Sequence, residues 1–418
     1  MTTGSKLTII ALALAALLPS AALRAEDGGA FSGYAPYSIY ALGDLSMPGS
    51  AYNRSMGGTG IASRNNRFIN TLNPAAVTAR DSLAVMTDFS MLQKNVIFHE
   101  DSKLAANNTC NISSLAFSLP LFNKTAAVVG ITPFASTGYR SSSHVTDPML
   151  LAEHGTIVDS YSGQGSLYQV YGAFGYNPFG GLSLGVQYNL YFGNVTKTFS
   201  RAFESESTRN IESTDELQLS GNNLKFGVQY EQIVGKKVKL GVGATWATSG
   251  IIKSADEKNG YSATGATFAP ELGIGLSFNY MEKFRAQLDY TRADWTVANL
   301  GAIDSNDKFA SCVSEALRFG MEYTPNRNDI RYYRKRVSYR AGAYCKNEYY
   351  TVESNGIAAY GITFGATLPV FRWYNGLTLG LDLGRRSSIG GDGISEMFVG
   401  FSFGVNLFDI WFQKPRYE

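Results

Sequence analysis

Apolar residues recur at every second position in many separate stretches between residues 82 and 411. In the clearest stretch, large apolar side chains alternate with polar or small ones: Leu182, Leu184, Val186, Tyr188, Leu190 and Phe192 against Ser183, Gly185, Gln187, Asn189 and Tyr191. An extended strand with this spacing carries all its apolar side chains on one face. The pattern therefore predicts strands with one apolar face.

Fourteen stretches of this kind follow one another along the chain. Their centres lie near Thr87, Phe117, Val129, Val170, Val186, Phe226, Val242, Ile274, Leu288, Phe319, Ala341, Ile362, Leu379 and Phe401. Antiparallel barrels of bacterial outer membranes close on an even number of strands. We therefore predict an all-β protein, a transmembrane antiparallel barrel of about fourteen strands spanning residues 82–413.

The connections between these stretches alternate in length, as short periplasmic turns and longer outer loops do. The long polar stretches run from residue 93 to 112, 136 to 164, 196 to 216, 249 to 267 and 292 to 314. The basic segment 325–336 is the exception, since a short periplasmic turn is expected there. This parity puts residues 414–418 in the periplasm, as a short tail. It also puts Trp246 and Trp295 in an outer aromatic girdle and Trp373 and Trp411 in an inner one, the alternative being ordinary packing.

The first residues have the form of a secretory signal peptide, which we assign to residues 1–25. A single Lys6 precedes an apolar run from Leu7 to Leu18, and small residues follow, with cleavage after Ala22 or Ala25. The apolar run is shorter than the ~20 residues that a membrane-spanning helix needs. Export fits a location in the outer membrane.

Composition favours a barrel over an ordinary soluble domain. Charged residues make up 17% of the chain, against about 25% in an ordinary soluble domain. A net charge of +2 gives no reason to expect a nucleic-acid partner. The three cysteines allow at most one disulfide, and Cys110 with Cys312 is the pair considered.

Residues 26–81 lack the alternation and are rich in Gly, Asn, Ser and Arg. They could not bury a core alone. Two interpretations remain open, a disordered periplasmic tail or a plug that becomes ordered inside a polar barrel.

Two regions of the chain carry recognisable motifs, the runs YNRSMGGTGIASRNN and LNPAAV from Tyr52 to Val77 and the closing ISEMFVGFSFGVNLFDIWFQKPRYE. The first region resembles the N-terminal hatch signature of the FadL family of outer-membrane transporters, and the second resembles FadL-like proteins of Bacteroidetes. The resemblance implies that residues 26–81 form a hatch that closes the lumen. Its candidate gating residues are Arg54, Gly57, Gly58, Gly60, Asn73, Pro74 and Ala75.

The resemblance further implies that hydrophobic ligands enter from outside and leave sideways through a kinked third strand. The third strand here, KTAAVVGITPFA, contains Gly130 and Pro133. Proline cannot donate a ladder hydrogen bond, so a gap or bulge there has a physical basis. The alternative is that Pro133 only ends the strand at the rim.

Charged side chains at predicted inward positions could hold the hatch in place. Candidate partners are Asp289, Glu322 and Asp382, which could pair with Arg54, Arg64 or Arg67 of the hatch. Equally, these charges could be solvated in a wet lumen.

An enzymatic function is not expected, and neither is a cofactor or metal. The only histidines, His99, His144 and His154, fall in predicted outer loops rather than at rigid positions. The resemblance instead implies passive uptake of hydrophobic compounds, with long-chain fatty acids as the single best guess. A protein-secretion shuttle or platform is the alternative, and an open diffusion porin comes third. The expected partners are the outer-membrane bilayer, a hydrophobic ligand, the barrel assembly machinery during biogenesis and, in the alternative, secretion components.

Overall fold

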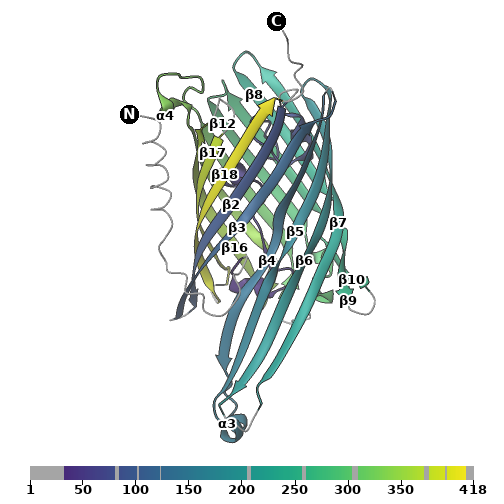
Figure 1. Ribbon diagram of the computed structural model, residues 1–418, viewed down its shortest axis with the longest axis vertical. Helices are drawn as coiled ribbons and strands as arrows, with labels where there is room; N and C mark the ends of the chain where they lie inside the picture. The colour runs from purple at the N-terminus through teal and green to yellow at the C-terminus, as the bar shows by residue number, and fades with distance from the viewer. Residues whose placement is uncertain are drawn as a thin grey trace. The chain divides into compact units, whose positions relative to one another are not determined.

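The alternating stretches form long antiparallel strands around a closed barrel in the computed structural model (Figure 1). The structure describes residues 33–80, 84–100, 103–122, 124–204, 209–256, 260–303, 309–370, 376–390 and 393–410. The predicted signal peptide and C-terminal tail lie outside these residues, as do Trp373 and Trp411.

The wall consists of antiparallel strands that follow one another around the barrel in chain order, three of them in two segments. They are β2 (Ala84–Glu100), β3 (Lys103–Pro120), β4 (Thr125–His144), β5 (Ile157–Phe179), β6 (Leu182–Phe203), β7 (Ile211–Val234), β8 (Val238–Ala247), β9 (Gly250–Asp256), β10 (Gly260–Phe268), β11 (Glu271–Tyr280), β12 (Phe284–Asp294), β13 (Phe309–Ser311), β14 (Val313–Tyr323), β15 (Ser338–Val352), β16 (Asn355–Pro369), β17 (Gly376–Ser388) and β18 (Ser395–Ile410). Pairing of β18 with β2 closes the barrel.

Three pairs of these elements are segments of single crossing strands. β8 and β9 both pair with β7, β10 and β11 continue one another beside them, and β13 and β14 both pair with β15. The wall therefore has fourteen strands, and every predicted strand centre lies on one of them. The predicted fold class is confirmed.

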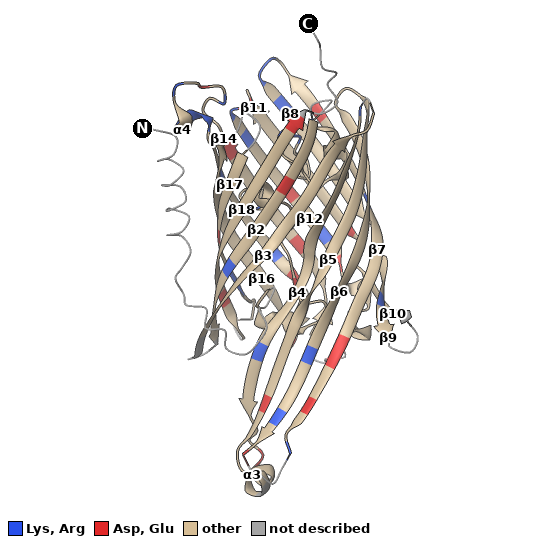
Figure 2. Cartoon of the chain, in the orientation of Figure 1, with Lys and Arg blue, Asp and Glu red and all other residues tan. Residues whose placement is uncertain are grey.

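The outer face of the wall is a belt of large apolar side chains. On β6, Leu184, Val186 and Leu190 point outward and are about two-fifths exposed, while Gln187 and Asn189 are buried inside. The cartoon shows few charges across the middle of the wall (Figure 2). Such a belt fits a hydrocarbon surrounding. None of the described helices is both long enough and apolar enough to span a membrane.

Several predicted outer loops are in fact strands. β4 to β7 continue past their neighbours and stay paired as far as His144 with Val158 and Arg201 with Ile211, ending near α3 (Pro148–His154) (Figure 1). Beyond the membrane both faces of a strand meet water, so alternation fades although the backbone ladder persists. Alternation alone therefore underestimated these strands.

Residues 33–80 lie inside the barrel, and we call them the plug. Its elements are η1 (Pro36–Ile39), β1 (Asp44–Leu45), α2 (Ala51–Arg54) and η2 (Pro74–Thr78). Asn73 caps η2 by accepting a hydrogen bond from the Ala75 N–H at 3.0 Å, and Pro74 suits the first turn. α2 begins with a capping box between Ser50 and Asn53.

The plug backbone approaches the wall most closely where the wall carries glycine. At each of these positions a Cβ atom would come within 3 Å of plug atoms, and we call the set the glycine girdle: Gly185, Gly227, Gly243, Gly275, Gly320, Gly342, Gly365 and Gly404. Some face one another across neighbouring strands, as Gly320 faces Gly342. The girdle leaves room for a backbone where any side chain would collide with it.

Replacing one girdle glycine should dislodge the plug while leaving the barrel closed. In Gly342→Val the new side chain meets the backbone of Met56 and Gly57, which cannot rotate away. Overpacking of this kind costs about 1–3 kcal/mol. We expect faster proteolysis within residues 33–80 and an unchanged heat-dependent gel shift of the folded barrel.

Gly172→Val is the matched control, because a Cβ there meets nothing within 4 Å. Equal proteolysis of the Gly342→Val, Gly172→Val and parent proteins would contradict the role given to the girdle.

Candidate functional site

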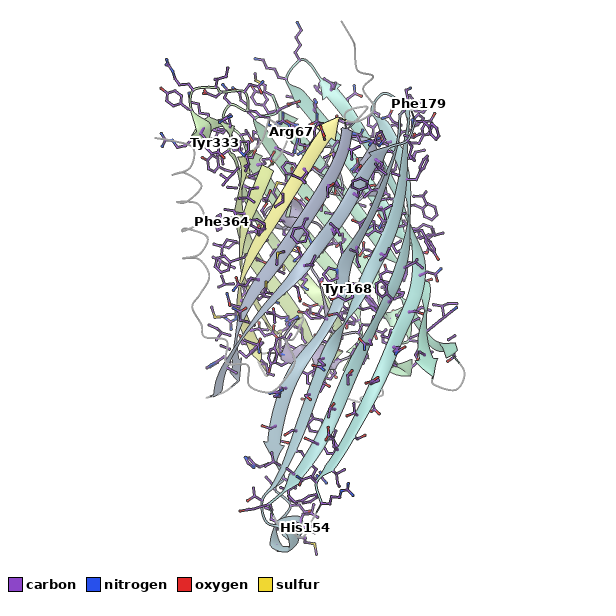
Figure 3. The ribbon with its side chains drawn as sticks, in the orientation of Figure 1. Arg67, His154, Tyr168, Phe179, Tyr333 and Phe364 are labelled. Atoms are coloured by element: carbon purple, nitrogen blue, oxygen red, sulfur yellow. The ribbon has the colours of Figure 1, made fainter. Side chains whose placement is uncertain are left out.

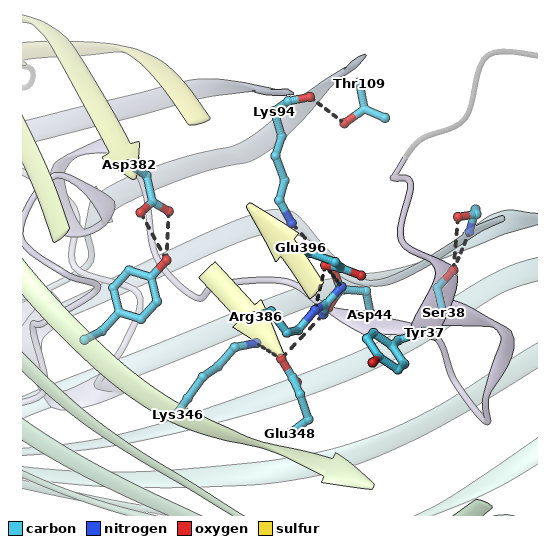
Figure 4. A network of polar contacts seen from close by, with 12 residues as sticks. Tyr37, Ser38, Asp44, Lys94, Thr109, Lys346, Glu348, Asp382, Arg386 and Glu396 are labelled. Carbon is cyan, nitrogen blue, oxygen red and sulfur yellow. Dashed lines mark hydrogen bonds and ion pairs between the residues drawn. The ribbon is translucent and has the colours of Figure 1, made fainter. Parts of the chain in front are cut away.

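A buried charge network joins the plug to the wall near the long-strand end of the barrel (Figure 4). Arg386 of β17 lies 2.6 Å from Asp44 of the plug and 2.6 Å from Glu396 of β18. It also lies 3.5 Å from Glu348 of β15, which Lys346 approaches to 2.8 Å. Because Arg386 and its two wall carboxylates are nearly inaccessible, removing any member would leave an uncompensated buried charge.

Asp44 is the plug's contribution to this network. Burial alone would raise the pKa of Asp44, but the positive charges of Arg386, Lys94 and Lys346 outweigh it and hold this pKa well below its usual range. The carboxylate therefore stays ionised at neutral pH, as its ion pair with Arg386 requires.

Aromatic side chains pack above this network and seal the same end of the plug. The Tyr349 hydroxyl donates to the Gly43 carbonyl at 2.6 Å, and the Tyr37 hydroxyl donates to the Ile394 carbonyl at 2.8 Å.

Trp295 belongs to this cluster, with its ring 4.9 Å from that of Tyr349 and only 4% exposed. Its predicted place in the outer girdle was wrong, because η3 (Thr296–Ala298) and η4 (Leu300–Ala302) follow it where a strand would have kept it outside. Trp246 is half exposed on the outer face, stacked on Phe226.

The middle of the plug is held through its backbone. One carboxylate oxygen of Asp289 accepts from the N–H groups of Gly60 at 2.6 Å and Ile61 at 2.9 Å. The N–H of Gly57, at a φ of +67°, donates to the Thr363 hydroxyl at 2.8 Å. Gly58 also has a left-handed φ, +79°, so the turn here requires glycine.

Near the short-turn end, plug aromatics meet wall arginines. Tyr52 stacks on Phe68 with ring centroids 4.3 Å apart, and the Arg340 guanidinium lies 4.3 Å from the Tyr52 ring. Arg285 donates to the Tyr52 hydroxyl at 2.8 Å. Glu322 pairs with Arg340 at 2.9 Å and with Arg285 at 3.5 Å, so one carboxylate offsets part of the positive charge beneath the rings.

Asn73, Pro74 and Ala75 lie where the plug meets β6, β7 and β8. The Asn73 amide donates to the carbonyls of Ile61 in the plug at 2.8 Å and of Val228 on β7 at 3.2 Å. Pro74 and Ala75 rest on girdle glycines of β6 and β7. Asn73 and Ala75 are completely buried.

For Arg54 and Arg64, the predicted pairing with wall carboxylates differs from the contacts found. Arg54 donates to the carbonyls of Met47 and Gly49 within the plug, and Arg64 donates to the Ser183 hydroxyl at 2.6 Å. Burial lowers the pKa of Arg54 to about 10, with Asp382 acting in the opposite direction. Of the three predicted wall partners, Asp382 accepts from the Tyr344 hydroxyl, Glu322 pairs with Arg340 and Asp289 accepts from plug amides. The carbonyl of Arg67 accepts from the Asn406 amide.

A cavity of about 370 Å³ lies between the plug and the wall. Its apolar lining comes from the plug and from strands around the whole lumen, and on β3, β4 and β5 it includes Ile112, Pro133, Phe134, Tyr168 and Tyr171. Its charged lining carries both signs: Asp44, Arg54, Lys94, Lys225, Glu271, Asp289, Arg318, Lys346, Glu348, Asp382 and Arg386. The space suits a small molecule with an apolar body and a polar end.

The wall is incomplete beside this cavity. β3 pairs with β4 only from Leu115 opposite Ile131 to Pro120 opposite Ala126. β3 is bulged at Ser113 against β2, and β4 is bulged at Phe134, directly after Pro133, against β5. The two strands therefore separate where the third strand was expected to kink.

The plug covers the edge of β4 that β3 leaves open. β1 pairs Asp44 with Ser136 and Leu45 with Ala135, and the Ser46 N–H donates to the Phe134 carbonyl at 2.9 Å. Farther along, the Ala35 N–H donates to the Gly138 carbonyl at 2.8 Å. Gly130 lies below the separation, under the side chain of Tyr171, where a Cβ would collide with the ring.

The glycine girdle and the Arg386 network were not found from sequence. The alternation of inward and outward positions along each strand did indicate that the residues of both face inward. The leucines of β17 face outward at odd positions, so Arg386 must face inward, and Gly185 stands among the polar positions of the clearest stretch. What parity could not show is which inward residues meet the plug.

The cysteines and histidines form no reactive centre in the part of the chain that the structure describes. Cys110, Cys312 and Cys345 are free thiols there, so Cys110 and Cys312 do not pair. His154 lies at the tip of the projecting strands (Figure 3). Within the described ranges, no group of three or more His, Cys, Asp and Glu residues could hold a metal ion.

Comparison with solved structures places the fold among FadL-like barrels. The Ralstonia pickettii toluene transporter TbuX is 12% identical, with a TM-score of 0.54 over 85% of this chain and 97% of its own. The P. putida toluene transporter TodX is 13% identical, with a TM-score of 0.54 over 89% of this chain and 100% of its own. A Pseudomonas aeruginosa FadL homologue is 9% identical, with a TM-score of 0.50 over 92% and 100%.

The fold of the chain is thus that of a FadL-like barrel. The model of the BamG family matches residues 7–264 and 256–418, and the chain belongs to this family. Curated protein sequences give no match.

Neutralising Asp289 should loosen the middle of the plug. Asp289→Asn keeps the shape but removes the charge that two N–H groups share, and hydrogen bonds to charged groups contribute roughly 1.5–3 kcal/mol. We expect amide hydrogen exchange at Gly60 and Ile61 to accelerate about tenfold or more. Asp382→Asn, whose carboxylate contacts Tyr344, should leave these two amides unchanged. Unaltered exchange in Asp289→Asn would show that the carboxylate does not hold the plug.

Proposed function

We propose that this barrel carries small hydrophobic or amphipathic molecules across the outer membrane and releases them sideways through the wall between β3 and β4. The observation that carries the proposal is the early end of the β3–β4 ladder beside a cavity whose lining includes Ile112 of β3 and Pro133 of β4. A barrel that only enclosed a water-filled pore would have no need of this break.

A sideways exit suits an apolar cargo. The outer face on either side of the break is apolar, with Ile112 about half exposed on β3 and Val129 about half exposed on β4. A molecule leaving here passes from the lumen directly to lipid, so its apolar surface is not exposed to bulk water. Pro133 leaves β4 without a backbone donor at the break, and Gly130 makes room for Tyr171 at its lower edge.

The first part of the plug acts as the gate in this proposal. Residues 35–46 complete the open edge of β4 with backbone hydrogen bonds, as an added strand does in peptide recognition. Release requires this segment to leave the edge, which also requires Asp44 to move relative to Arg386. Residues 51–75, which rest on the glycine girdle, need not move.

The solved relatives support the proposal of a hydrophobic cargo. Those with the same fold include toluene transporters and a monoaromatic hydrocarbon channel. A charged end on the ligand would suit the lysines and arginines of the cavity, so we keep long-chain fatty acids as the first substrate to test, with toluene beside them.

A second candidate function, a platform for protein secretion, rests on the projecting strands. β4 to β7 form a sheet beyond the membrane belt, and β7 presents Ile211 to Gln218 at its edge with β6 as its only ladder partner among the described residues. An extended chain could pair with this edge, although Glu212, Asp215 and Glu216 on it oppose indiscriminate pairing.

Uptake in a deletion strain separates the two functions. Cells lacking the protein should take up radiolabelled long-chain fatty acid or toluene more slowly than cells with the parent protein. Complementation with Gly130→Leu should restore at most a fraction of the uptake, because the new side chain drives Tyr171 into the cavity. Gly172→Leu, on the outer face, is the control and should restore it fully.

Equal uptake of both compounds with and without the protein would exclude transport of these substrates. Co-purification with secretion components would then support the platform function.

A further inference from the structure

The connection between β14 and β15 stands apart from the other turns at its end of the barrel. Residues 324–337 join the two strands and include α4 (Tyr333–Arg336), whereas the β11–β12 connection is only residues 281–283. In Figure 1, α4 lies beside the upper edge of the wall, at the same end as the short turns. The proposed transport through the β3–β4 break does not involve this segment.

The segment is held in a defined conformation. The Asn326 N–H donates to the Lys335 carbonyl at 2.8 Å, and the Tyr332 N–H donates to the Asp329 carboxylate at 2.7 Å. The Tyr333 hydroxyl donates to the Pro369 carbonyl at 3.1 Å, tying α4 to the end of β16. The segment therefore presents its side chains from fixed positions.

The charge of the segment is positive and only partly balanced. Its basic residues are Arg327, Arg331, Arg334, Lys335 and Arg336, and its one acidic residue is Asp329. Arg327 approaches Glu282 and Glu322, and Lys335 approaches Asp329 at 3.5 Å. The exposed guanidinium groups of Arg331 and Arg334 have no ion-pair partner among the described residues. Two cations thus remain available to an outside ligand.

Aromatic side chains fix the level of this segment relative to the membrane. Tyr323 and Tyr339 end the outward faces of β14 and β15, and both are about half exposed. Tyr332 and Tyr333 continue this row, and Figure 3 shows Tyr333 at the edge of the wall. The Tyr339 hydroxyl donates to the Arg334 carbonyl at 3.3 Å. Tyrosine concentrates at headgroup level in membrane proteins, so the two arginines lie at that level.

We infer that Arg331 and Arg334, with Tyr332 and Tyr333, form a binding surface for the phosphate headgroup of an anionic phospholipid. One guanidinium group can donate hydrogen bonds to two oxygens of the same phosphate. Basic clusters directly beside a membrane span attract anionic lipids. Ile330, 89% exposed next to Arg331, supplies an apolar contact for the lipid itself. A lipid is favoured over an acidic protein because the arginines adjoin the lipid-facing belt. This inference is independent of the proposed transport.

Native mass spectrometry of the purified barrel with added phosphatidylglycerol or phosphatidylcholine tests the inference. The parent protein should retain phosphatidylglycerol preferentially. The double variant Arg331→Gln with Arg334→Gln should bind it roughly 30-fold more weakly and bind phosphatidylcholine as the parent does. The matched control is Lys236→Gln with Lys237→Gln, exposed cations on another short turn, which should change binding less than threefold.

A heat-dependent gel shift confirms that each variant is folded. Retention of the phosphatidylglycerol preference by the arginine variant would overturn the inference, and so would an equal loss in the lysine control, which would indicate nonspecific attraction. Loss of an acidic protein partner with unchanged lipid binding would also overturn it, in favour of a protein site.

Discussion

The close approach of the plug backbone to the wall is the constraint on which the rest of the structure depends. A barrel lumen lined throughout by side chains would leave no room for a backbone, and the glycine girdle provides that room along strands from β6 around to β18. Because the plug lies this close, its N–H groups reach the Asp289 carboxylate and the Thr363 hydroxyl directly. Polar groups that would otherwise need water are satisfied by the wall.

The same close fit couples the closure of the lumen to the closure of the wall. β1 supplies the neighbour that β4 lacks after Ile131, and Asp44 of β1 is also the plug's link to Arg386. One short segment therefore covers the break and is held by a buried ion network across the lumen. Opening the wall requires separating this segment from the edge of β4 and from Arg386, whereas the part of the plug that rests on the girdle can remain in place.

The sequence predicted the strands well because their period is local, and it predicted the plug less well because its contacts are not. Alternation placed all the strand centres, while the projecting parts of β4 to β7 lost their alternation in water and were taken for loops. Pro133 marked a place where the ladder does break. The pairing of Arg54 and Arg64 could not be inferred, since any inward carboxylate was an equal candidate, and Trp295 turned inward because its strand ends there.

Cross-linking β1 to β4 tests the central claim that this plug segment closes the path most directly. Leu45 and Ala135 are opposite one another in the ladder, at a spacing that a disulfide can bridge. With Cys110, Cys312 and Cys345 replaced by serine, the variant Leu45→Cys with Ala135→Cys should lose uptake of the hydrophobic substrate when oxidised and regain it when reduced. Uptake by the fully cross-linked protein at the parent rate would contradict the account, because the molecule would then cross without moving the plug from β4.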